Sequence, residues 1–216
     1  MYKEFLINKI KQKRELSGIA DEVVERVLNS FLQKNPKLEQ EIIASKKLEK
    51  SSAVETCVKN VRALLRRVSG SFEIDNKDRE NLISQNKIQE VLATHSSTKE
   101  RLEYYDEIYN KIFAITRKPN TVLDLGCGLN PLSFPSKDII YYACDINKEN
   151  LKLVEKYFQN NNIKGKVFFC DLTKSDNSFP KTDVCFLFKV LDIIESKGHK
   201  MAERIITQLS CKYIVV

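Results

Sequence analysis

Hydrophobic and polar residues follow two different periods along this chain of 216 residues. Up to about residue 118, apolar side chains recur every three or four positions, which is typical of amphipathic helices. The clearest case follows Asp21, where Val23, Val24 and Val27 share one face. The pattern therefore predicts a helical N-terminal region.

The same region contains signals for where its helices begin and end. Asn35-Pro36 should end the helix that begins at Asp21, and Ser69-Gly70-Ser71 should end the next long one. A short helix should precede them both. We expect further helices over residues 38–68 (with a break near 51–52), 77–93 and 98–115.

Beyond the turn Lys118-Pro119-Asn120, short apolar runs alternate with helical segments. This alternation predicts a parallel sheet with right-handed crossovers, and so an α/β, Rossmann-like domain with its site at the carboxyl ends of the strands. The expected strands are 121–125, 139–145, 166–171, 183–189 and 213–216, and the expected helices are 148–161 and 198–209. We place the helical domain at residues 1–94 and the sheet domain, with its lead-in helix, at 95–216.

Composition narrows the class of protein. Hydrophobic residues make up 42% of the chain, which is enough for a core, and no apolar run approaches the ~20 residues of a membrane span. The charged N-terminus does not resemble a secretory signal. Six scattered cysteines, without a C-x-x-C pair or a histidine cluster, favour reduced thiols over a metal site. We therefore expect a cytoplasmic protein that binds neither a membrane nor a metal.

Positive charge is concentrated in one predicted helix. The formal net charge is +7, and residues 43–70 hold seven basic residues against two acidic ones. Lys59, Arg62 and Arg66 recur at helical spacing on one face, and Arg67 follows. These four residues form either a phosphate-binding stripe or a solvated helix face, and composition alone favours neither.

The stretch TVLDLGCGLNP at residues 121–131 carries the clearest chemical signal. An apolar strand runs into Asp124 and then into Gly126 and Gly128, and glycines let a backbone approach a ligand closely. A dinucleotide site would need G-x-G-x-x-G to hold a pyrophosphate, but Asn130 comes next in this pattern and Pro131 follows it. S-adenosylmethionine (SAM), which has no phosphate, fits better. The alternative is an ordinary strand–helix turn.

Two more acidic residues end the next predicted strands. Asp145 lies 19 positions after Gly126, where a carboxylate can accept from both ribose hydroxyls. Asp171 and Leu172 end the third strand, where they could hold the adenine amino group and the ring face. Asp124 would meet the methionyl ammonium. The alternative is that Asp145 and Asp171 cap the segments that follow them.

Lys189 lies near the end of the fourth predicted strand. A cation is unexpected beside the positive sulfonium of SAM, so it should face an anionic substrate; otherwise it is a strand-end lysine whose ammonium reaches solvent. The chain lacks an Asn/Asp-Pro-Pro-Tyr-like motif and paired cysteines, which mark methylation of exocyclic amines and of pyrimidine C5. Guanine N7 has a free lone pair and needs neither, so its methylation depends mainly on alignment and exclusion of water.

Four motifs resemble those of one known family, the aminoglycoside-resistance 16S rRNA methyltransferases of the Arm/Rmt type. They are LDLGCGLNPL at 123–132, HSSTKERL at 95–102, LFKVLDIIE at 187–195 and LLRRVSGSF at 64–72. The second motif makes the combination specific, because it is not general to SAM-dependent enzymes. The resemblance is strongest over about residues 60–195.

This resemblance implies a SAM-dependent enzyme that methylates N7 of a guanine in the decoding A site of the small ribosomal subunit, giving aminoglycoside resistance. It implies that Arg101 holds the methionine carboxylate, that Lys189 is the catalytic residue on the target side, and that His95 orders the loop. It also implies a monomer whose helical N-terminal region docks on the 16S rRNA of the assembled 30S subunit.

The chain departs from the family pattern at its end. It stops at Ile214-Val215-Val216, where the family continues into two further strands. We therefore expect the fifth strand to be an edge with Val215 and Val216 partly exposed, and this form to be less stable and of low activity. The competing hypotheses are a SAM-fold RNA-binding protein without turnover and a small-molecule or protein methyltransferase, which the basic helical region disfavours.

Overall fold

The computed structural model describes residues 2–69, 72–74, 78–195 and 200–216. The chain divides into two compact units, Met1–Ser71 and Phe72–Val216. The division lies at 71/72 instead of the predicted 94/95, because apolar residues between positions 82 and 92 belong to the core of the sheet unit. Residues 70–71, 77 and 198–199, which the predicted helices and turns included, lie outside the described residues.

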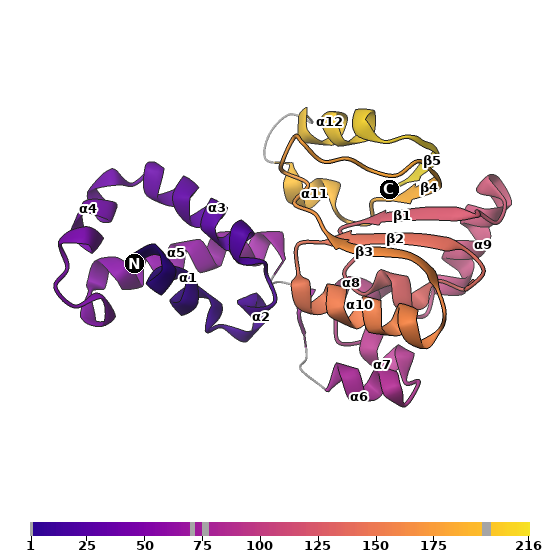
Figure 1. The fold of residues 1–216 in the computed structure, drawn as a ribbon, viewed down its shortest axis with the longest axis horizontal. Helices are drawn as coiled ribbons and strands as arrows, with labels where there is room; N and C mark the ends of the chain where they lie inside the picture. Colours follow the sequence, from indigo (N-terminus) through magenta and orange to yellow (C-terminus); the bar gives the residue numbers. More distant parts are fainter. Residues whose placement is uncertain (1, 70–71, 75–77, 196–199) are drawn as a thin grey trace. The chain divides into compact units, whose positions relative to one another are not determined.

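The N-terminal unit is helical, as its periodicity predicts. The helix predicted over 38–68 is broken, as expected, but the interruption of α-helical geometry is longer than predicted and extends from Ala44 to Ser52. Pro36, expected to end the preceding helix, begins the next one, since proline is tolerated in a first helical turn. The elements are α1 (Tyr2–Lys11), α2 (Arg14–Ser17), α3 (Asp21–Gln33), α4 (Pro36–Ala44), the 3-10 helix η1 (Leu48–Lys50) and α5 (Ser52–Val68) (Figure 1).

Helix α5 is the centre of this unit. It contacts α1, α2, α3 and α4. Its buried residues include Val58, Val61 and Leu65, which recur at intervals of three and four as an amphipathic helix requires. These residues form the apolar face by which α5 packs in this unit.

The second unit begins with four short helices before its sheet. They are α6 (Arg79–Ser84), α7 (Ile88–Leu92), α8 (Ser96–Arg101) and α9 (Tyr105–Thr116). The predicted helices over 77–93 and 98–115 are therefore each divided in two. Between α6 and α7, Asn86 takes the left-handed backbone conformation (φ 58°), which commonly ends a helix. The apolar periodicity continues across both breaks because the flanking residues pack into the same core.

Five parallel strands form the sheet, in the order β3-β2-β1-β4-β5, with helices on both of its faces (Figure 1). This confirms the predicted Rossmann-like fold. The fourth strand ends three residues before the predicted end at 189. The elements are β1 (Thr121–Leu125), the 3-10 helix η3 (Asn130–Ser133), β2 (Ile140–Asp145), α10 (Lys148–Asn160), β3 (Lys164–Phe169), β4 (Thr182–Phe186), α11 (Leu191–Ile194), α12 (Lys200–Gln208) and β5 (Cys211–Val215).

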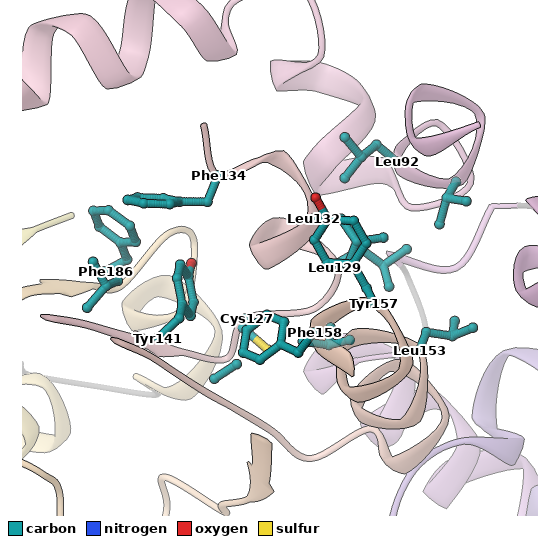
Figure 2. Packing of buried hydrophobic residues seen from close by; sticks show 14 of the residues in the cluster. Leu92, Cys127, Leu129, Leu132, Phe134, Tyr141, Leu153, Tyr157, Phe158 and Phe186 are labelled. Carbon is teal, nitrogen blue, oxygen red and sulfur yellow. The ribbon is translucent and has the colours of Figure 1, made fainter. Parts of the chain in front are cut away.

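Side chains alternate across the sheet and fill two separate cores. On one face, Val122, Tyr141 and Phe186 pack with residues of α7, α9 and α10, and Figure 2 shows part of this packing. On the other face, Leu123 packs with Ile205 of α12. The sheet is therefore the middle layer of three.

The same alternation places the acidic residues. Asp124 lies two residues after Val122 on β1, and Asp145 lies four residues after Tyr141 on β2. Both side chains therefore point to the face covered by α9 and α10, at the carboxyl ends of neighbouring strands.

Strand β5 pairs with β4 alone within the described ranges. Val215 is half-buried and Val216 is 73% exposed, as predicted. All six cysteines are free thiols. Across the described residues, no helix combines the length and apolar character that crossing a membrane needs.

Candidate functional site

The turn after β1 is built around two glycines that no other residue could replace without strain. Gly126 and Gly128 both have positive φ angles, 65° and 50°. A Cβ atom on Gly126 would lie 2.5 Å from Cγ2 of Val190, and one on Gly128 would lie 3.0 Å from Cε1 of His95. The amide of Cys127 donates to a carbonyl of β2 at 3.0 Å, which fixes the turn against the next strand. The side chains of Val190 and His95 therefore pack directly against the backbone of this turn, which glycine permits.

Asp145 ends β2 directly beside this turn. The amide of Gly128 donates to its Oδ2 at 2.8 Å, and the amide of Asn147 donates to its Oδ1 at 2.8 Å. Burial raises the pKa of Asp145, while these backbone donors act in the opposite direction. An ionised carboxylate has about four acceptor positions, so acceptor capacity remains for hydroxyl donors.

Asp124 lies at the centre of a buried polar network. It is 1% exposed, and its Oδ2 accepts from Asn130 Nδ2 at 2.9 Å and from the hydroxyl of Tyr141 at 2.8 Å. The hydroxyl of Tyr105 donates to Oδ1 of Asn130 at 3.3 Å. Burial raises the pKa of Asp124 to about 6. A ligand that brings a positive charge would therefore be stabilised here.

Arg101, the last residue of α8, supplies a cation to the same network. Its guanidinium lies over the rings of Phe188 and Tyr105, at 5.1 and 5.9 Å from the ring centroids. Its buried Nε has no hydrogen-bond partner among the described residues. Its charge lowers the pKa of Asp124, so the two groups are close enough to interact. The unpartnered donor of Arg101 could bind the carboxylate of an amino acid, and the nearby carboxylate of Asp124 could bind its ammonium.

Asp171 and Leu172 follow β3 at the same edge of the sheet, and both are buried. Oδ1 of Asp171 accepts from the amide and the hydroxyl of Thr173, at 3.0 and 2.6 Å. The capping role that the sequence left open for Asp171 is thus present at its Oδ1. The carbonyl of Leu172 accepts from Nη2 of Arg204 at 2.7 Å, which holds this segment near α12.

Lys189 lies in the turn after β4 and not in the strand itself. It has a positive φ of 57°, which is uncommon and strained for a lysine. Its ammonium forms an ion pair with Glu100, the neighbour of Arg101 in α8. The side chain of Lys189 is 45% exposed, so it remains accessible from solvent.

The predicted basic stripe consists of two kinds of residue: Arg62 and Arg66 bond to other helices of the same unit, whereas Lys59 and Arg67 are exposed. Arg62 donates from Nε to the carbonyl of Ile10 at 3.2 Å and also donates to that of Lys9. Arg66 donates to Oε1 of Glu15 through two nitrogens, at 3.0 and 2.7 Å. These two arginines hold α1 and α2 against α5, because helix C-terminal carbonyls and carboxylates need such donors.

Arg67 instead borders a groove between α3 and α5. The groove has a volume of about 320 Å³ and contains two cations and no acidic residue. One aromatic residue, Phe31, and the exposed Leu64 form its apolar part. Its lining residues are Ser30, Phe31, Lys34, Asn60, Ala63, Leu64 and Arg67.

The structure brings Arg101, Asp124, Asp145 and the glycine turn to one edge of the sheet. Sequence reasoning missed Asn130, Tyr141, Tyr105 and Phe188 as their partners. Tyr141 could have been found, because it lies an even number of residues before Asp145 on one strand and so shares its face. The partners from α9 and from the turn after β4 have no such signal.

Comparison with known proteins identifies related sequences. The family model described as "Ribosomal RNA methyltransferase (FmrO)" matches residues 13–216. The 16S rRNA (guanine(1405)-N(7))-methyltransferase of Micromonospora rosea is 30% identical over 161 residues, covering 73% of this chain and 57% of that protein. The protein of the same description from Micromonospora echinospora is 31% identical with the same coverage. The chain thus spans little more than half the length of these curated relatives.

Solved structures resemble the chain at the level of the fold. The 16S rRNA methylase RmtB matches with a TM-score of 0.75 at 22% identity, covering 97% of this chain and 80% of that one. The 16S rRNA methyltransferase RmtF in complex with S-adenosyl-L-homocysteine matches with a TM-score of 0.75 at 21% identity, covering 97% and 77%. The arrangement of helices and strands is therefore shared over nearly the whole chain.

Proposed function

The chain belongs to the FmrO family of ribosomal RNA methyltransferases, and from this premise we propose that it transfers a methyl group from SAM to N7 of a guanine in 16S rRNA. The observation that carries the proposal is the buried guanidinium of Arg101, whose Nε has no hydrogen-bond partner among the described residues, close to the buried carboxylate of Asp124 and with Asp145 at the end of the next strand. The curated relatives that bear this activity in their descriptions support it.

The residues at the sheet edge fit SAM from one end to the other. Arg101 would hold its carboxylate, and Asp124 would hold its ammonium. Asp145 would accept from the ribose hydroxyls, beside the backbone of Gly126 and Gly128. Asp171 and Leu172 would hold the adenine amino group and ring. This is the set of cofactor residues proposed from the sequence, with the unpaired Nε of Arg101 as added support.

Bound SAM supplies an electrophilic methyl group on a sulfonium, which a nitrogen with a free lone pair can accept without a general base. The protein would therefore act by aligning the guanine and excluding water. Lys189 lies on the open side of the site, paired with Glu100, and would hold an anionic group of the RNA. Phe188, already against Arg101, would keep water from the carboxylate-binding end.

The finer features of the target follow from the family resemblance. We propose that the guanine lies in the decoding A site, that the substrate is the assembled 30S subunit, and that methylation gives resistance to aminoglycosides. We also propose that the protein acts as a monomer in the cytoplasm. The test is formation of N7-methylguanosine in 30S subunits incubated with this chain and SAM; its absence there would overturn the proposal.

The affinity for SAM should depend on pH through Asp124. Burial raises its pKa from the usual 3.8 to about 6, so between these values the native state holds a proton that the unfolded state releases. This group therefore lowers the stability of the free protein as pH rises through that range. The ammonium of SAM needs the ionised form, so affinity should rise about tenfold between pH 5 and pH 7.

Calorimetric titration with SAM across this pH range measures the effect. Asp124→Asn should bind more weakly and show no such rise, because an amide does not ionise. A wild-type affinity that stays constant from pH 5 to pH 7 would show that Asp124 does not meet the ammonium.

The groove between α3 and α5 should contact rRNA. Two cations, one aromatic ring and no carboxylate suit a phosphate and an adjoining base. Replacing both Lys34 and Arg67 with glutamate should weaken 30S binding. The slope of log binding constant against log salt concentration should become shallower by about two, since about one counterion is released per phosphate contact. SAM affinity should not change.

A matched control makes the same charge change outside the groove. Lys37 and Lys50 are exposed residues of the same unit, and reversing both should leave the salt slope nearer to wild type. Arg62→Glu is expected to destabilise the unit instead, because its partners are backbone carbonyls. Equal effects of the two double reversals on the salt slope would assign the groove no role of its own.

A further inference from the structure

A buried ion pair lies outside the residues proposed to touch the cofactor. Arg79 and Glu73 are 2.6 Å apart, and their side chains are only 11% and 10% exposed. Burying two charges is costly unless other hydrogen bonds satisfy them. Thr94 and Asn150, each 2% exposed, supply those bonds. We call these four residues the clasp.

The clasp ties three segments of the sheet unit together. Arg79 donates from Nε to Oγ1 of Thr94 at 2.7 Å, from Nη2 to the carbonyl of Thr94 at 3.1 Å, and from Nη1 to Oδ1 of Asn150 at 3.1 Å. Nδ2 of Asn150 donates to Oε1 of Glu73 at 3.0 Å. The start of α6, the end of α7 and the first turn of α10 are thereby fixed to one guanidinium.

One arm runs from the clasp through His95. The amide of Ile74 donates to the carbonyl of Thr94 at 3.0 Å, and Glu73 and His95 form an antiparallel bridge. The ring of His95 stacks on Phe72 with centroids 5.5 Å apart. Burial lowers the pKa of His95 to about 4, so this ring is neutral at physiological pH.

This arm ends on one oxygen of Asp145. The imidazole of His95 occupies the space where a side chain on Gly128 would lie. The amide of Gly128 donates to Oδ2 of Asp145 at 2.8 Å. The ring therefore packs against the backbone of Gly128, whose amide makes this bond.

The second arm runs along α10 to the other oxygen. Asn150 lies in the first turn of α10, and its amide donates to Oδ1 of Asn147, the N-cap residue, at 3.1 Å. The amide of Asn147 in turn donates to Oδ1 of Asp145 at 2.8 Å. The two arms thus start at Arg79 and end on the two carboxylate oxygens of Asp145.

We propose that Arg79 is a positioning residue that orients the carboxylate of Asp145 toward the ribose of the cofactor. Accepting from two vicinal hydroxyls requires both oxygens to be held at defined angles, and each oxygen is held by one arm. The inference rests on the proposed function, because it assumes that Asp145 meets the ribose. The inference adds that Arg79, 66 positions before Asp145 in the chain, determines how well Asp145 binds the ribose.

Calorimetry with two ligands separates positioning from general stability. S-adenosylhomocysteine and its analogue without the ribose 2′-hydroxyl are titrated into the wild-type chain and into Arg79→Gln. We expect wild type to prefer the complete ligand by about tenfold, as one hydrogen bond to a charged group gives, and the variant to keep less than about threefold. A variant that only lost stability would bind both ligands more weakly by the same factor.

The matched control is Lys156→Gln. Lys156 on α10 pairs with Glu80 on α6 at 2.9 Å, so it joins two of the same segments, but its pair is exposed. This variant should keep the wild-type preference between the two ligands. Asn150→Ala removes the side-chain bonds that connect the second arm to Arg79 and Glu73, but keeps the backbone amide of residue 150 and the Arg79–Glu73 pair. It should also reduce the preference and serves if Arg79→Gln does not fold.

The outcomes distinguish this inference from the function on which it rests. A wild-type preference retained in Arg79→Gln, or in Asn150→Ala if the first variant does not fold, would overturn the positioning role while SAM binding stands. A wild-type chain that binds neither ligand would overturn the proposed function and this role with it.

Discussion

Replacing Arg101 with alanine should abolish measurable SAM binding and leave the fold intact. A buried carboxylate needs a fixed cation, and a charge-assisted pair made through two nitrogens contributes at least about 3 kcal/mol, or more than about a hundredfold in affinity. The fold should survive because the buried Nε of Arg101 has no hydrogen-bond partner to lose among the described residues, and the lost contacts with the rings of Phe188 and Tyr105 should cost only about 1–2 kcal/mol. Calorimetry with SAM and circular dichroism of the same sample measure the two effects.

The matched variant is Arg101→Lys. It keeps the charge but not the planar fork of donors, so its affinity should fall between those of wild type and Arg101→Ala. Both variants should melt close to wild type in the absence of ligand. Normal SAM binding by a folded Arg101→Ala would show that another group holds the carboxylate and that the family role does not apply at this position.

Replacing Asp145 with alanine should weaken SAM binding by about 1–3 kcal/mol, or roughly fivefold to 150-fold. The carboxylate is expected to accept from the ribose, and its loss leaves those hydroxyls without partners. The amides of Gly128 and Asn147 also lose their acceptor, so the melting temperature should fall as well. Asp145→Asn keeps an acceptor and the shape, and should therefore retain more of both.

Calorimetry and thermal melting of the two variants separate these contributions. An affinity for SAM that is unchanged in Asp145→Ala would remove the ribose assignment, whatever happens to stability. It would also remove the basis for a role of the clasp in cofactor binding.

The fold could be predicted because its signals are local. Strand–helix alternation after residue 120 indicated a parallel sheet, and the structure has one. Asp124 and Asp145 lie at the carboxyl ends of neighbouring strands, as their positions in the sequence indicated. The divided helices were missed because their breaks depend on turns such as that at Asn86, while the apolar period continues across them. The boundary between the units lies at 71/72 and not at the predicted 94/95, because a helical sequence pattern does not indicate which of two cores a helix packs into.

Residues of the candidate site could be predicted only where the residue type itself indicates a role, as glycine does in a tight turn and an acidic residue does at a strand end. Glycines and acids marked the turn and the strand ends, but nothing in the sequence connects Asn150 with Glu73, 77 residues apart. The basic stripe illustrates the opposite limit. Spacing placed Arg62 and Arg66 on one face correctly, yet that face packs on α1 and α2, so their charges have partners within the unit.

The central claim is that this chain methylates N7 of a guanine in 16S rRNA, and primer extension tests it most directly. Purified 30S subunits are incubated with the 216-residue chain and SAM, treated with borohydride and aniline to cleave at N7-methylguanosine, and copied across the decoding A site. The account predicts one SAM-dependent stop beside a single guanine, absent with Arg101→Ala. Binding of both SAM and 30S subunits without any such stop would contradict it and favour an RNA-binding protein that does not turn over.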